Sequence, residues 1–117
     1  MATAPFLERV KGLPRLGIGV STEYGARTAA GALDVGALRA ARPEFAEFLE
    51  VGVEADKGLD DDAAAWVRDG GAATSHFLDV NLDDEDDFDD DWVARVKALI
   101  AQTKPAWLCG DAGLWHF

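Results

Sequence analysis

The sequence has little cysteine, little positive charge and no long hydrophobic stretch. Its single cysteine, Cys109, can form neither an internal disulfide nor a zinc site made of cysteines alone. We therefore expect the protein to be located in the reducing cytoplasm. Only 11 basic residues stand against 22 acidic ones, and the net charge of -11 argues against nucleic acid or anionic membranes as partners. No apolar stretch approaches the ~18 residues of a membrane-spanning helix. Glu8 and Arg9 interrupt the region where an export signal would be apolar.

The residues that are present are sufficient for one packed domain. Of the 117 residues, 49% are hydrophobic and 28% are charged, which is the composition of a globular chain rather than a disordered one. No internal repeat or linker divides the chain. We therefore predict a single α/β unit over residues 1–117.

Four short apolar segments predict strands, because each is rich in β-branched or aromatic residues and is bounded by turn-forming residues. They are residues 16–20, 48–54, 73–80 and 106–111. The segments between them have helix signals, with Asp34 as an expected N-cap and further helices over 60–71 and 91–103. This β-α-β-α-β-α-β order predicts parallel strands joined by right-handed crossovers. Four such units form either a small open α/β sheet or half of a TIM (β/α)8 barrel.

Side-chain alternation along the second predicted strand separates two faces. Its odd-numbered positions are apolar and are expected to pack against the helices. Glu50 and Glu54 share the opposite, inner face with Gly52. An uncompensated buried carboxylate costs several kcal/mol, so two of them favour a ligand site occupied by a metal, another cation or a proton.

Acidic and imidazole side chains are expected to meet at one rim of the sheet. With four parallel strands, Glu23, Glu54, His76 and Asp111 lie towards the C-terminal ends, where α/β proteins build their sites. Carboxylate and imidazole ligands together suit iron, manganese or zinc. The alternative interpretation is structural, with His76 as an ordinary strand histidine and Asp111 as a loop cap.

Two other conspicuous features receive a structural interpretation. The acidic residues 83–91, interrupted by Phe88, are expected to form a solvated loop that leads into the last helix. Their spacing partly resembles a calcium loop, but Asp84 stands where such a loop needs glycine, so we predict no EF-hand. Cys109 is expected to be a buried strand cysteine, because no activating group stands beside it in the sequence.

Three motifs in a fixed order resemble a known family. They are LGIGV at 16–20, FLEVGVE at 48–54 and SHFLDVNL at 75–82. Together they resemble the DUF692 family, the multinuclear non-haem iron-dependent oxidative enzymes of peptide natural-product maturation. The resemblance implies a TIM barrel related to xylose isomerase, of which this chain matches the N-terminal half.

The resemblance also implies a site and partners. Glu54 and His76 correspond to two metal ligands, Asp111 to an acidic position of the fourth strand, and Glu50 to an inner supporting residue. The implied cofactor is non-haem iron, as one or more ions. The implied substrate is a ribosomally made peptide, oxidised at a metal-coordinated thiolate and delivered by a partner protein.

Two positions depart from the family's pattern. Glu23 and Tyr24 follow the first motif where the family usually has a metal-binding histidine. Ala112 takes the place of the fourth-strand histidine, and His116 is displaced from it. These departures imply a variant subfamily, or one that holds fewer metal ions.

Two further functions stay open, and so does the state of the chain. One is a xylose isomerase-like sugar isomerase or hydrolase that uses zinc, magnesium or manganese. The other is a non-catalytic acidic α/β module that binds a basic partner. Because half a barrel has two open edges and an exposed inner face, we expect a truncated chain or pairing with a second copy or a separate half-barrel. We expect the chain alone to be incomplete for activity.

Overall fold

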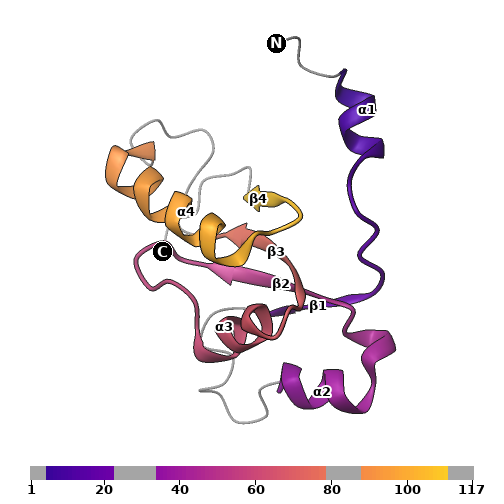
Figure 1. Ribbon diagram of the computed structural model, residues 1–117. Coiled ribbons are helices and arrows are strands. Elements are labelled where there is room, and N and C mark those ends of the chain that lie inside the picture. Colours follow the sequence, from indigo (N-terminus) through magenta and orange to yellow (C-terminus); the bar gives the residue numbers. More distant parts are fainter. Residues whose placement is uncertain (1–4, 23–33, 79–87, 111–117) are drawn as a thin grey trace.

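The computed structural model describes residues 5–22, 34–78 and 88–110 (Figure 1). In chain order the elements are α1 (Phe6–Lys11), β1 (Gly19–Thr22), α2 (Val35–Ala41), the 3-10 helix η2 (Pro43–Phe45), β2 (Phe48–Val53), α3 (Asp61–Arg68), β3 (Ala72–Phe77), α4 (Asp90–Thr103) and β4 (Leu108–Gly110). Strands and helices therefore alternate from β1 onward, as the sequence predicts.

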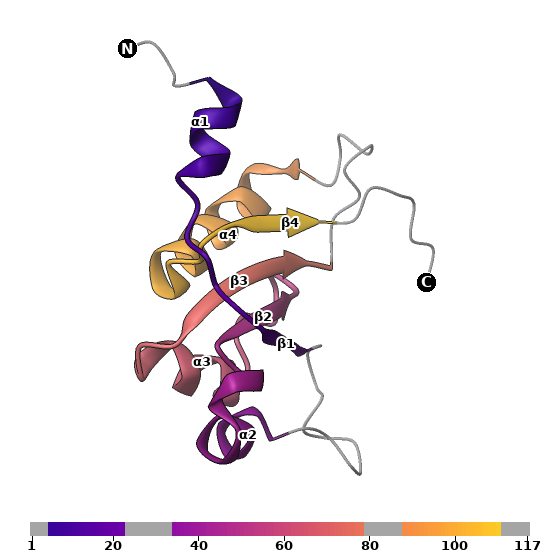
Figure 2. The ribbon, with the colours of Figure 1, turned by 90° about the vertical axis from the view of Figure 1, so that its right-hand side faces the viewer.

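The four strands form one sheet in the order β1-β2-β3-β4, and every neighbouring pair is parallel. Figure 2 shows them side by side in sequence order, with β1 and β4 at opposite edges. The predicted α/β class with an all-parallel sheet is confirmed. The architecture is compatible with a half TIM-barrel-like βα unit.

The hydrophobic core lies between the sheet and its helices. Leu49, Val51 and Val53 of β2 are at most 1% exposed, so the predicted helix-facing side of this strand is confirmed. They belong to one buried cluster with residues from each of the three crossover helices, Val35, Ala63, Trp66, Val96 and Leu99. Burial of this one face therefore anchors the helices and leaves the other face of the sheet for polar residues.

Aspartate caps start the three crossover helices. The carboxylates of Asp34, Asp60 and Asp89 accept hydrogen bonds from the amides three residues later, at 2.9, 2.7 and 2.6 Å. Each bond pairs an amide that the first helical turn leaves without a partner. The predicted cap at Asp34 is confirmed, and the exposed residues 89–91 of the acidic run lead into α4 as expected. Residues 83–87 lie outside the described residues.

Two N-terminal elements differ from the prediction. The first strand was expected at 16–20, whereas β1 begins at Gly19. Gly17 has φ +83°, which interrupts an extended strand, and the amide of Ile18 donates to the Glu47 carboxylate at 2.7 Å. The helix α1 was not predicted. It has no buried residue, so it lacks the core-facing pattern by which helices are recognised.

The helices of the described part of the chain are short. The longest, α4, has 14 residues, whereas a membrane crossing needs about 20 predominantly apolar ones. None of the described helices has the length and apolar character that such a crossing requires.

Candidate functional site

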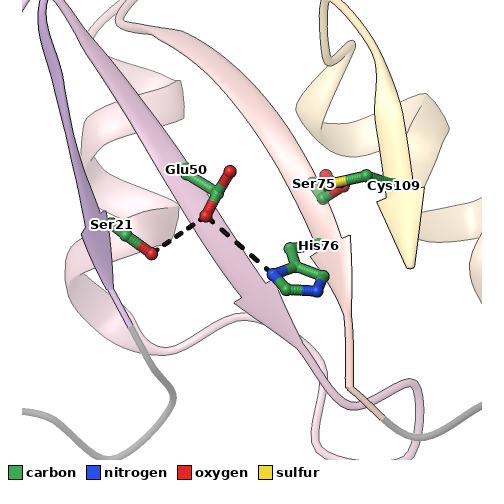
Figure 3. Close-up of polar contacts among 5 residues, drawn as sticks. All are labelled: Ser21, Glu50, Ser75, His76 and Cys109. Carbon is green, nitrogen blue, oxygen red and sulfur yellow. Dashed lines mark hydrogen bonds and ion pairs between the residues drawn. The ribbon is translucent and has the colours of Figure 1, made fainter. Parts of the chain in front are cut away.

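Polar side chains cross the sheet on the face opposite the core. We call Ser21, Glu50, Thr74, His76 and Cys109 the polar row, one or two from each strand. Ser21 pairs in register with Glu50, Glu50 with Thr74, and His76 with Cys109. Figure 3 shows Ser21, Glu50 and His76 pointing towards one another in front of the sheet, with helices behind it. Register and alternation thus bring four strands' residues to one face.

Glu50 is the centre of the polar row. Its Oε1 atom accepts a hydrogen bond from the Ser21 hydroxyl at 3.1 Å and lies 3.9 Å from His76 Nδ1. The Glu50 and His76 side chains are 33% and 27% exposed, so the pair is sheltered yet open to solvent. At the longer distance the two groups are too far apart for a hydrogen bond, and they form an ion pair only when the ring is protonated. The Glu50 carboxylate faces the Nδ1 side of the imidazole, where it can orient the ring.

Thr74 carries an unpartnered hydroxyl on the same face. Its side chain is 0% exposed, and no described group makes a hydrogen bond to its Oγ1 atom. A buried hydroxyl without a partner costs about 1–3 kcal/mol, so folding alone gives no reason to retain it.

The first prediction concerns this hydroxyl. Thr74→Val is expected to raise the free energy of unfolding by about 1 kcal/mol, because it removes a buried polar atom without breaking a bond. Thr103→Val is the matched control, since Thr103 is also buried, at 5% exposed, and its hydroxyl donates to the Leu99 carbonyl at 2.8 Å. The control should lose about 1 kcal/mol. Urea unfolding measures both, and a loss of stability in both variants would contradict the assignment of an unpartnered hydroxyl.

Glu54, one of the predicted ligands, lies one residue beyond β2. Its backbone carbonyl accepts the amides of Lys57 and Gly58, both at 3.0 Å, which closes a tight turn. The Lys57 ammonium lies 2.6 Å from Glu54 Oε2, and the Glu54 side chain is 21% exposed. The turn therefore holds this carboxylate close to a cation at the C-terminal end of β2.

His76 lies next to last in β3 and contacts Glu50, the predicted supporting residue. Asp111, the third predicted ligand, lies outside the described residues, directly after Gly110 at the end of β4. Glu23 also lies outside them. The described geometry therefore joins His76 to Glu50 and places Glu54 on the neighbouring strand end.

Cys109 corrects one expectation. It was expected to be buried, but it is exposed, and its sulfur lies 3.6 Å from the Ser75 carbonyl oxygen. The reason is that β4 is an edge strand with an exposed, exposed, partly buried pattern. Ser21 was not predicted as a partner of Glu50. Its position could have indicated this, because Ser21 follows Gly17 and Gly19 at alternate positions and therefore belongs to one face of the strand.

Other candidate sites are few in the part of the chain that the structure describes. No group of three or more histidine, cysteine, aspartate or glutamate side chains is arranged there to hold a metal ion. A cavity of about 300 Å³ lies between α2 and α3, beside Asp34, Arg39 and Trp66, on the helix side of the sheet. It contains no predicted site residue. Comparisons with protein-family models, curated proteins and solved structures find no match.

Proposed function

We propose that this protein is a metal-dependent oxidative enzyme that uses non-haem iron and modifies a ribosomally made peptide. The observation that supports it is the Glu50–His76 pair on the helix-free face of an all-parallel sheet. Sheets of this kind carry their sites at the C-terminal strand ends. Glu54 directly follows β2, which neighbours the strand that carries His76, and Asp111 directly follows Gly110 in the sequence.

The donor set fits a hard or borderline divalent metal. His76 would bind through Nε2, and the carboxylates of Glu54 and Asp111 would complete the ligands, a combination that iron, manganese and zinc accept. Glu50 would act as the supporting residue, because its carboxylate faces Nδ1 and would orient the ring. Ser21 in turn orients Glu50 through its hydroxyl.

Bound ferrous iron would supply one-electron and O₂ chemistry to this site. The residues of this chain would bind and orient the reacting group. Glu50 and His76 are about a third and a quarter exposed, so part of the helix-free face is open to a peptide beside them. The peptide, a peptide-delivering partner protein and the cytoplasmic location enter this proposal through the family resemblance and the single cysteine.

Iron binding tests the proposal directly. The apo chain, kept anaerobic, is titrated with ferrous iron, and His76→Ala is expected to weaken binding by about tenfold or more. Glu50→Gln should weaken it by about tenfold, because it removes the charge that orients the ring. Glu44→Gln is the control, since Glu44 is exposed, lies on η2 and pairs with Arg42 rather than with the polar row.

Three results would contradict the proposal. The first is no binding of ferrous iron to the wild-type chain. The second is equal weakening by Glu44→Gln and His76→Ala. The third is a clear preference for zinc or magnesium over iron with no oxidation of a thiol peptide, which favours an isomerase or hydrolase instead.

A further inference from the structure

The helix-free face of the sheet is only partly covered in the described residues. Thr74 is buried there, but Ser21 and Cys109 are exposed, and the Glu50 and His76 side chains are 33% and 27% exposed. All-parallel sheets occur almost only with both faces covered. The described hydrophobic core lies on the helix side of the sheet, and the strands follow one another in sequence order. All the crossover helices therefore lie on the same face. Such a sheet covers its second face by closing into a barrel.

Among the described residues, both edges of this sheet also lack the usual protection. Natural edge strands usually carry charges, lysine above all, or a proline that prevents further pairing. The edge strands β1, GVST, and β4, LCG, contain neither. Large apolar side chains stand exposed beside them, Ile18 at 58%, Leu108 at 45% and Trp107 at 37%. These edges have the composition of strands that pair with a neighbour.

We propose that two copies of this chain pair edge to edge, β4 of each with β1 of the other, and close an eight-stranded barrel around the polar row. A two-fold axis parallel to the strands relates the two copies without reversing the direction of their strands. Both β4–β1 pairs between the copies would therefore be parallel, like the three pairs within one copy. One kind of contact then satisfies both edges of both copies. Two four-stranded sheets also reach eight strands, the number at which parallel βα units close.

The charge distribution is compatible with a second copy. Each copy has a net charge of -11, but the strands that would meet are uncharged, so no like charges oppose each other in the ladder. The remaining repulsion is long-range and screened by salt, so association should strengthen as salt rises. Each copy would contribute its Glu50–His76 pair to one shared lumen. The site is therefore half complete in a single copy.

Cross-linking tests the predicted contact. In Ser21→Cys, the new thiol and Cys109 lie on opposite edges of the same sheet, three strand spacings or about 14 Å apart. A disulfide needs Cα atoms within about 7 Å, so a bond between these strands must join two copies. A short bismaleimide serves as a second probe, because it tolerates a stagger of about two residues, about 7 Å. Ala98→Cys, an exposed position on α4, is the control and should give no linked dimer.

Mass measurement tests the assembly, with EDTA present so that metal binding plays no part. Sedimentation equilibrium should give twice the chain mass of 12.5 kDa. Leu108→Lys, which adds the usual protection of an edge, should raise the dissociation constant of the dimer by about tenfold or more. Phe45→Lys is the matched control, since Phe45 is also 45% exposed but lies on η2. Circular dichroism checks that both variants fold.

Each of four outcomes would overturn this proposal: a single-chain mass at every concentration, masses that grow beyond two copies, equal cross-linking of Ala98→Cys and Ser21→Cys, or equal dissociation by Phe45→Lys and Leu108→Lys. Because the measurements need no metal, their failure leaves the proposed iron chemistry untouched. Loss of iron binding in a stable dimer would conversely overturn the proposed function alone.

Discussion

Leu49→Ala is expected to lower the free energy of unfolding by about 3–5 kcal/mol. Leu49 is 0% exposed in the middle strand β2, with Val20 and Ala73 as its register partners. The substitution removes buried apolar surface and leaves a cavity that the flanking strands cannot fill. Since domains of this size have only about 5–15 kcal/mol of stability, a large part of it would be lost.

Urea unfolding at one fixed chain concentration measures this effect, because association of copies would change the apparent stability. Leu13→Ala is the matched control. Leu13 is 45% exposed and follows α1, so the same chemical change should cost less than about 0.5 kcal/mol there. Similar losses in the two variants would show that the helix-facing side of β2 is not the core.

Trp66→Ala is expected to destabilise the protein by about 3–5 kcal/mol. The indole is 4% exposed, and its Nε1–H donates to the Ala72 carbonyl at 2.9 Å. A Cβ atom at Gly71 would lie 2.2 Å from Nε1, so the turn before β3 is packed directly against the ring. Trp66 therefore sets where β3 begins, and with it the position of His76.

Trp66→Phe separates the two contributions of this side chain. It keeps most of the buried ring but removes the hydrogen bond to Ala72, so a loss of about 1–2 kcal/mol is expected. Thermal or urea unfolding of both variants measures the difference. Equal losses in Trp66→Phe and Trp66→Ala would mean that the hydrogen bond, rather than burial, carries the effect.

The two proposals meet at the polar row but depend on different properties. The iron proposal requires the Nε2 atom of His76 and nearby carboxylates. The dimer proposal requires the uncharged edges β1 and β4. If both hold, the lumen of the dimer contains two copies of the Glu50–His76 pair, and edge variants such as Leu108→Lys should weaken iron binding as well.

Local chemistry explains which parts of the fold were predictable. The strand β2 alternates apolar and polar residues, so its start and its two faces were predicted, including Glu50 on the face away from the helices. It ends at Val53, one residue before the predicted end. The cap at Asp34 was also predicted, because it bonds an amide only three residues away. Such interactions join residues that are close in the chain, so they can be predicted from the sequence.

Other features depend on partners distant in sequence. The start of β1 is set by Glu47, 29 residues away from the Ile18 amide that it binds. Cys109 was expected to be a buried strand cysteine because no activating group stands beside it in the sequence, but its edge position in the sheet leaves it exposed. The contact of Glu50 with Ser21 and His76 likewise depends on the register of three strands.

Periodicity and capping alone thus establish an acidic α/β chain with parallel strands and a polar inner face, because these follow from interactions within a few residues. Only the folded sheet decides that Glu50 lies between Ser21 and His76, that the Thr74 hydroxyl is buried without a partner, and that β1 and β4 are the edges of the described sheet. These features arise from strand register and burial, which bring together residues that no local pattern relates.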